Sequence, residues 1–185
     1  MDKFVMEGKV RDSSDKGSRS ARSLRASGQM PVNVYGFGQA NSMLAVDSTA
    51  FYQALENSHR LFQIDCDGHS ELGLIKEVQY DTFGDHTIHA DLARVKMDDV
   101  VETTIHIQTI GIAKGTSAGG TLDIAYHHMP VRGKLSDLTN KMVVNIENIA
   151  ADESIRVRDL DLPDGVESTL PAETPVIMVH GRRGG

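Results

Sequence analysis

Tryptophan is absent from this chain of 185 residues, and phenylalanine and tyrosine number only five and four. Proteins that bind single-stranded nucleic acid without sequence preference stack bases on aromatic side chains, so this scarcity argues against such a platform. Cys66 is the only cysteine, which excludes an internal disulfide and zinc sites built from several cysteines. No apolar run approaches the roughly 20 residues of a membrane span, and the first residues lack a signal-peptide pattern. We therefore expect a soluble cytoplasmic protein with no membrane partner.

Positive charge is also in short supply, because 19 Lys and Arg residues face 26 Asp and Glu residues and the formal net charge is −7. Segment 9–36 has the opposite balance. Its six basic and two acidic residues give a net charge of +4, which leaves −11 for the rest of the chain once +4 is subtracted from −7. Like charges repel, so a local concentration of positive charge in an acidic protein indicates a binding site for a polyanion.

Arginine recurs at every third position within this basic segment, at Arg19, Arg22 and Arg25. Residues 17–28 carry signals for the start and end of a helix, and at about 100° per residue the three arginines fall within an arc of about 120°. Leu24 lies nearly opposite, and few apolar residues remain to anchor the helix. We interpret it as an anion-binding helix that is loosely held when free and ordered by its ligand. The alternative is a solvated surface helix.

Short strands with alternating polarity dominate the rest of the first half. The segment 61–66 places Phe62, Ile64 and Cys66 on one face, so we expect Cys66 to be a core residue rather than a nucleophile. In the segment 87–95, Ile88, Ala90 and Leu92 are expected on the inner face, with His89 and Asp91 on the outer one. The expected elements of this half are strands at 42–46, 61–66, 69–80 and 87–95, a short helix capped by Asp47 or Ser48, and a turn at 67–68.

A polar joint at 96–99 precedes a second series of alternating segments. The expected strands of this half are 101–112, 121–126, 142–146, 154–157 and 175–179. The pattern predicts a mainly β protein with short helices, divided into domains at 1–95 and 96–185.

Several segments together resemble a known family: the 5S rRNA-binding bacterial large-subunit ribosomal protein twenty-five family, in its two-domain CTC general-stress type. The order and spacing of the arginine helix, the proline, the Tyr-Gly pair, the Val-Gln pair and the His-x-Asp motif carry the resemblance. The similar stretches are Arg11, KGSRSARSLRASGQMPVNVYG (16–36), IKEVQYD (75–81), IHADLARV (88–95), GIAKGTSAGGTLD (111–123) and SIRVRDLDLPDGVE (154–167).

This resemblance implies an N-terminal β-barrel that binds an irregular helical region of 5S rRNA, followed by a second β domain whose role is less settled. The implied partners are 5S rRNA and the large ribosomal subunit, and a neighbouring ribosomal protein is considered for domain 96–185. Helical RNA offers 2′-hydroxyls and base edges in a wide minor groove, so a protein that recognises it needs hydrogen-bonding side chains more than aromatic ones. The low aromatic content agrees with that chemistry.

The candidate RNA-binding residues form two classes. Basic side chains suit phosphate contacts, whereas the polar residues match the family pattern for contacts with the RNA grooves. Each polar candidate has a structural alternative: a packed ring for Tyr35, an ordinary exposed strand position for Gln79, and a surface charge for Asp91. A carboxylate that faces RNA must accept from a base amino group or support a neighbouring cation or histidine. The candidates are Arg11, Lys16, Arg19, Arg22 and Arg25 for phosphates, and Tyr35, Gln79, His89 and Asp91 for the grooves.

Other chemistry finds little support in the sequence. His86, His89 and Asp91 have spacing that suggests metal ligands, but His86 would project from the opposite face of a strand, so we expect no metal. The glycine-rich segment 111–120 lacks the ordered pattern of a phosphate-binding loop, and no nucleophile motif is present. We therefore expect neither an enzyme nor a cofactor. A stress-associated protein-interaction module with secondary RNA contact stays open as an alternative, and a nucleotide-binding enzyme is a remote one.

Overall fold

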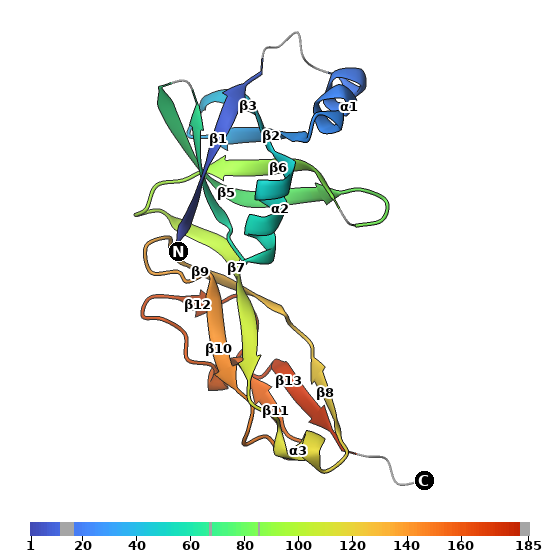
Figure 1. Cartoon of the computed structure of the whole chain (residues 1–185). Helices are drawn as coiled ribbons and strands as arrows, with labels where there is room; N and C mark the ends of the chain where they lie inside the picture. Colours follow the sequence, from blue (N-terminus) through green and yellow to red (C-terminus); the bar gives the residue numbers. More distant parts are fainter. Residues whose placement is uncertain (12–16, 67, 85, 182–185) are drawn as a thin grey trace. The chain divides into compact units, whose positions relative to one another are not determined.

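The structure, a computed structural model, describes residues 1–11, 17–66, 68–84 and 86–181. It divides the chain into two compact units, Met1–Asp99 and Val100–Gly185 (Figure 1). The first unit is a closed barrel with strand order β1-β3-β2-β6-β5-β4. Its elements are β1 (Lys3–Val10), α1 (Ser18–Ala26), β2 (Gln29–Gly36), β3 (Gln39–Asp47), α2 (Ser48–Glu56), β4 (Leu61–Cys66), β5 (His69–Tyr80) and β6 (Thr87–Arg94).

Strand β1 closes the barrel because it pairs with two different strands. Its first part, 3–7, runs parallel to β4, and its last part, 8–10, runs antiparallel to β3. At the change of partner, Gly8 lies so close to β4 that an added Cβ would stand 2.4 Å from Cγ2 of Ile64. Real Cβ atoms do not approach so closely, so this position requires glycine.

The barrel core is built from the inward side chains of the strands and one face of α2. Phe51 and Ala54 of α2 are buried, and the ring of Phe51 stacks on Phe62 of β4 with centroids 4.6 Å apart. Asp47 caps the helix, since its Oδ1 accepts a hydrogen bond of 2.7 Å from the backbone N–H of Ala50. Cys66 is 2% exposed in the same core, as its alternation with Phe62 and Ile64 predicted.

The expected inner face of β6 is wrong at one position. Ala90 and Leu92 are buried as predicted, but Ile88 is only half-buried, and Thr87 takes the buried position with 2% exposure. The reason is an irregularity in the pairing with β5. Gln79 lies opposite His89 and Tyr80 opposite Thr87, so Ile88 is skipped and the simple alternation fails there.

The second unit contains two small sheets, with strand orders β10-β7-β9-β12 and β11-β13-β8. Strand β9 was not among the expected strands, because Pro130 and Gly133 weaken its β pattern. The elements of this unit are β7 (Val100–Ile110), α3 (Lys114–Ser117), β8 (Thr121–Ile124), β9 (His128–Lys134), β10 (Lys141–Asn145), β11 (Ser154–Arg156), a 3-10 turn (Val157–Asp159), β12 (Glu167–Ser168) and β13 (Pro175–His180).

A closed barrel followed by a second β-rich unit confirms the predicted fold class. Among the described residues, no helix has both the length and the apolar character needed to cross a membrane.

Candidate nucleic-acid interface

Helix α1 holds the arginine face away from the barrel core. None of its residues is buried, and Arg19 and Arg22 are exposed without an ion pair to any described residue. Arg25 differs, because it is half-buried and its Nη1 donates to the carbonyl oxygen of Ile88 at 3.4 Å. This hydrogen bond ties the helix to the beginning of β6. Two of the predicted phosphate ligands are therefore free to bind an anion, while the third also anchors the helix.

Two further basic candidates lie near this helix in the sequence. Arg11 directly follows β1 and is half-buried, and its backbone N–H donates to the carbonyl oxygen of Met43 at 2.8 Å. Lys16 lies outside the residues that the structure describes.

The polar candidates gather on the outer face of three neighbouring strands, β2, β6 and β5. The pairing places Asn33 of β2 opposite Asp91 of β6, and Glu77 of β5 opposite Asp91 from the other side. Gln79 lies opposite His89 in the same way. Residues that are directly opposite on neighbouring strands project from the same face of the sheet. The register alone therefore assembles these five side chains into one surface, which we call the strand surface.

Asn33 braces the two central side chains of the strand surface. Its Nδ2 lies 3.1 Å from Nε2 of His89 and donates to Oδ1 of Asp91 at 3.2 Å. One amide NH2 group can serve both acceptors, which assigns the ring proton of neutral His89 to Nδ1. That nitrogen lies 3.9 Å from Oδ1 of Asp91. The side chains of His89 and Asp91 keep 22% and 28% exposure, so a ligand can still reach them.

Gln79 and the neighbouring Tyr35, which we add to the strand surface, are more open. Tyr35 is 37% exposed and lies opposite Ala93, so its ring is on the outer face rather than in the core. Gln79 is exposed, and its Nε2 donates to Oε1 of Glu77 at 3.4 Å.

Sequence reasoning missed Asn33 and Glu77. The signal for Asn33 was its position between the buried Val32 and Val34, which predicts an outward side chain beside that of Tyr35. Glu77 gave no such signal, because an irregularity in the pairing after Ile75 determines which residue faces Asp91. Two carboxylates directly opposite each other repel. Their presence favours a partner that brings hydrogen-bond donors to this point.

Arg94 near the end of the barrel strands is engaged internally and contributes nothing to this surface. Its Nε donates to Oε2 of Glu71 at 2.7 Å and its Nη2 to Oε1 at 3.1 Å, while Nη1 donates to the carbonyl oxygen of Ala40 at 3.0 Å. The hydrogen bonds from Arg94 hold the pKa of Glu71 below its usual value and raise the pKa of Arg94 itself. The pair stabilises the barrel by joining β5, β6 and the beginning of β3.

The structure gives the competing sites little support. In the described part of the chain, no three His, Cys, Asp or Glu side chains are placed to hold a metal ion. The glycine-rich segment includes α3 and the turn after it, and Gly115 and Gly120 are packed against backbone. A Cβ on Gly115 would lie 2.6 Å from the backbone N of Ala151, and one on Gly120 would lie 2.7 Å from the oxygen of His180. Such close packing leaves no cradle for a phosphate.

Comparison with known proteins assigns the chain to a family. The model of the ribosomal L25p family matches residues 6–92, and the model of the C-terminal domain of ribosomal protein TL5 matches residues 100–183. The large ribosomal subunit protein bL25 of Rhodopirellula baltica is 31% identical over 164 residues, which cover 89% of this chain and 76% of that protein. The chain belongs to the ribosomal L25p family.

Two other L25p proteins show that the similarity extends along both units. The bL25 proteins of Akkermansia muciniphila and of a Thermoanaerobacter species are each 30% identical to the chain, over 170 and 172 residues. These alignments cover 90% and 91% of the chain, and 85% and 86% of the relatives. The resemblance noted in the sequence is thus confirmed, including the two-domain type.

Membership in the L25p family also confirms the prediction that the chain is not an enzyme, since this is a family of structural ribosomal proteins. Every candidate residue from Arg11 to Asp91 lies within the part of the chain that the L25p model matches. Arg94, which is committed to the internal pair with Glu71, lies just outside it.

Proposed function

We propose that the chain is a structural constituent of the large subunit of the cytoplasmic ribosome, and that it binds 5S rRNA through α1 and the strand surface. The observation that carries this proposal is the juxtaposition of two kinds of group. The hydrogen bond from Arg25 to Ile88 places a helix with free guanidinium groups beside the strand that carries His89 and Asp91.

The two parts of the interface have different tasks. Arg19 and Arg22 are exposed, so they can contact phosphates and displace counterions, which gives affinity and orientation without sequence information. Arg11 and Lys16 are proposed for the same role.

The strand surface suits the minor groove of helical RNA, where 2′-hydroxyls and base edges are accessible. Tyr35, Gln79 and His89 can donate hydrogen bonds there, and Gln79 can also accept them. The carboxylates of Asp91 and Glu77 only accept, and phosphates would repel them. We assign them to donors such as a base amino group, which makes them the residues that discriminate between RNAs.

A gel-shift titration of the full chain against 5S rRNA, with transfer RNA as competitor, tests the proposal. If four to five basic side chains meet phosphates, the logarithm of the affinity falls with the logarithm of the salt concentration at a slope of about −4. Arg22→Ala weakens binding to both RNAs and lowers the magnitude of the slope by about 1. A chain that ignores 5S rRNA at low salt, or a slope near zero, contradicts the proposal.

The strand surface has its own test in the same assay. Asp91→Asn removes the charge but keeps the shape, so it reduces the preference for 5S rRNA over transfer RNA more than it reduces total affinity. Lys141→Ala, a change of one exposed charge in the second unit, is the matched control and leaves both quantities unchanged. An equal loss on both RNAs from Asp91→Asn and Arg22→Ala contradicts the division of tasks.

A neighbouring ribosomal protein is a second proposed partner, bound by residues 100–185. Ile110 and Val143 project from the same face of the sheet formed by β7 and β10 and are 46% and 57% exposed. Ile112 is 72% exposed two residues further on. A pull-down from ribosomes after ribonuclease treatment retains this partner and loses it in the variant with Val143→Ser. Loss of every partner on ribonuclease treatment contradicts this second contact.

A further inference from the structure

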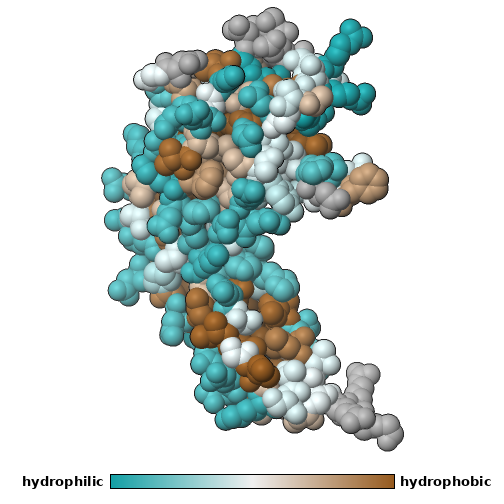
Figure 2. Space-filling model, viewed as in Figure 1, coloured by the Kyte–Doolittle hydropathy of each residue, from teal (hydrophilic) through white to brown (hydrophobic). Residues whose placement is uncertain are grey.

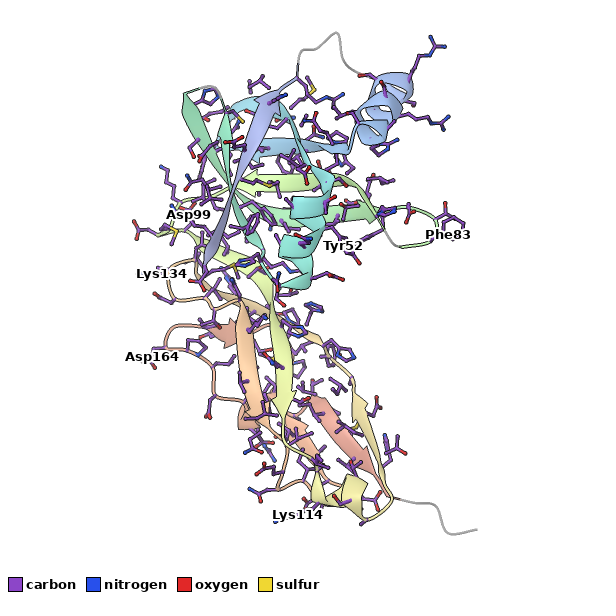
Figure 3. All side chains as sticks on the ribbon, in the orientation of Figure 1. Tyr52, Phe83, Asp99, Lys114, Lys134 and Asp164 are labelled. Atoms are coloured by element: carbon purple, nitrogen blue, oxygen red, sulfur yellow. The ribbon has the colours of Figure 1, made fainter. Side chains whose placement is uncertain are left out.

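Phe83 is the most exposed large hydrophobic residue among those that the structure describes, at 86%. It lies between β5 and β6 and has no ring or cation contact with any described residue. Figure 3 shows its side chain pointing outward from the tip of this connection, and Figure 2 shows the tip as a hydrophobic projection in a largely hydrophilic neighbourhood. Single exposed hydrophobic residues are common and need no special explanation. Phe83 differs from them in the turn that carries it and in its position beside the strand surface.

The backbone around Phe83 is a braced turn. The N–H of Gly84 donates to the carbonyl oxygen of Asp81 at 3.1 Å, so Phe83 is the third residue of a four-residue turn. The N–H of Asp81 donates to the oxygen of His86 at 2.9 Å, and Oδ1 of Asp81 accepts from the N–H of His86 at 3.3 Å. Gly84 has φ +79°, which favours glycine at that corner. The turn therefore holds the backbone of Phe83 at the tip of the connection, where its ring is 86% exposed.

This turn continues the two strands that form the proposed RNA-binding surface. Gln79 precedes it on β5 and His89 follows it on β6, and these two residues lie opposite each other. The hydrogen bond from Arg25 to Ile88 brings α1 to the same end of β6. Helix α1 and the β5–β6 connection project from the same side of the barrel (Figure 1). Phe83 thus extends the strand surface beyond the edge of the barrel, on the side of the barrel from which α1 also projects (Figure 1).

We propose that Phe83 stacks on the face of a base in the bound RNA and so holds the end of the strand surface on its ligand. This inference rests on the proposed function, because it needs RNA on that surface. The side chain offers no hydrogen bond and no charge, and the carboxylate of Asp81 in the same turn disfavours a phosphate. A base face at a bulge, a loop or a non-paired step is the RNA group that matches an uncharged ring. Stacking of this kind tolerates any base, so Phe83 adds affinity rather than sequence selection.

Phe37 provides a matched control within the same unit. It is also an exposed phenylalanine, at 53%, but it lies in the turn between β2 and β3, and Nζ of Lys96 stands 5.1 Å from its ring centroid. Strands β2 and β6 are parallel, and the turn follows the end of β2 while the β5–β6 connection precedes β6. The two rings therefore lie at opposite ends of these strands.

The test measures the affinity of the full chain and its variants for 5S rRNA at several salt concentrations. Phe83→Ala is expected to lower the affinity about 5- to 100-fold, which is the fold-change that matches loss of one aromatic stack. The salt slope stays unchanged because no phosphate contact is lost. Phe83→Tyr keeps at least half of the affinity, and Phe37→Ala binds within twofold of the original chain. Chemical probing of the complex shows one base newly reactive in the Phe83→Ala complex.

Each other result overturns the inference. If the original chain binds 5S rRNA and Phe83→Ala binds equally well, Phe83 has no part in RNA binding, whereas the proposed function stands. If Phe83→Ala binds RNA normally but enters ribosomal subunits poorly, the ring contacts a protein instead. If the original chain does not bind 5S rRNA, the proposed function fails first, and the inference fails with it.

Discussion

Arg19 and Arg22 of α1 carry the same charge as Arg94 at the end of β6, but their surroundings differ. Arg19 and Arg22 project from a helix with no buried residue, without an ion pair to any described residue. Arg94 has a side chain that is 8% exposed and donates to Glu71, Ser42 and the carbonyl of Ala40. The first group is free to bind a ligand, while the second is already satisfied by the protein. The number of basic residues in a segment therefore says less about ligand binding than the number of basic residues whose hydrogen-bond donors remain unused.

The cost of desolvating a guanidinium group explains why Arg94 is surrounded by acceptors while Arg19 and Arg22 stay exposed. A buried guanidinium is stable only when an anion and further acceptors surround it, and Glu71 with its neighbours provides them for Arg94. An exposed guanidinium keeps its water and gives it up only when a phosphate arrives. We expect variants in the two regions to affect different measurements, and the following predictions are ordered from the largest expected effect to the smallest.

Arg94→Ala is expected to cause the largest loss of stability. It leaves the carboxylate of Glu71, whose side chain is 15% exposed, without its main partner, and removing the partner of a part-buried charged group costs about 3 kcal/mol. Denaturant unfolding of the first unit measures the change. Arg22→Ala is the control and alters the free energy of unfolding by less than about 0.5 kcal/mol. Equal effects of the two substitutions would remove the distinction between the regions.

Glu71→Gln tests the same pair through pH, with an expected loss of about 2 kcal/mol near neutral pH. Hydrogen bonds from Arg94 hold the pKa of Glu71 below its usual value of about 4.5. A carboxyl with a lowered pKa in the folded state stabilises the protein above its unfolded pKa and loses that contribution as pH falls through the folded pKa. The difference in stability between the original chain and Glu71→Gln therefore shrinks below about pH 4.5. A difference that stays constant down to pH 3 would show that the charge of Glu71 is not involved.

The double change of Arg19 and Arg22 to alanine is expected to lower the affinity for 5S rRNA about tenfold at moderate salt and to reduce the magnitude of the salt slope by about 2. Filter binding at several salt concentrations measures both. The stability of the barrel stays unchanged, because neither side chain has an ion pair with a described residue. A loss of stability without a loss of affinity would show that these arginines, like Arg94, stabilise the barrel and do not bind RNA.

The smallest expected effect is a change in how well ordered helix α1 is. Because none of its residues is buried, its amides are expected to exchange with solvent faster than those of β6 in the free protein, and 5S rRNA is expected to slow them. Hydrogen exchange followed by mass spectrometry measures this protection. Slow exchange in the free protein would show that the hydrogen bonds of Arg25 and Ser27 already hold the helix rigid.

Much of this arrangement could be predicted from the sequence because local periodicity determines it. The arginine spacing predicted the charged face of α1, and alternation predicted that Cys66 is buried and that His89 and Asp91 share an outer face. The rest depended on pairing between distant strands. Irregularities at Gln79 and Ile75 moved Ile88 out of the core and brought Glu77 opposite Asp91, and no local pattern encodes such shifts.

The same limit applies to Asn33 and Arg94. Asn33 contacts His89 and Asp91 only because β2 pairs in parallel with β6, and the local sequence of neither strand predicts that pairing. Arg94 stands in a stretch that resembles the family pattern, but its partners come from residues 40, 42 and 71. Periodicity identifies which side of a strand a residue occupies, whereas tertiary pairing decides what it meets there.

The divided pairing of β1 has a consequence for the order in which the protein can fold during synthesis. Strand β1 leaves the ribosome before β3 and β4, but it needs β3 for its last residues and β4 for its first ones, so it must wait for both. The ring of strands then stays open until β6 emerges to bridge β2 and β5. In nascent chains that end before β6, the barrel is still open, and α1 has been synthesised without the strand to which Arg25 ties it.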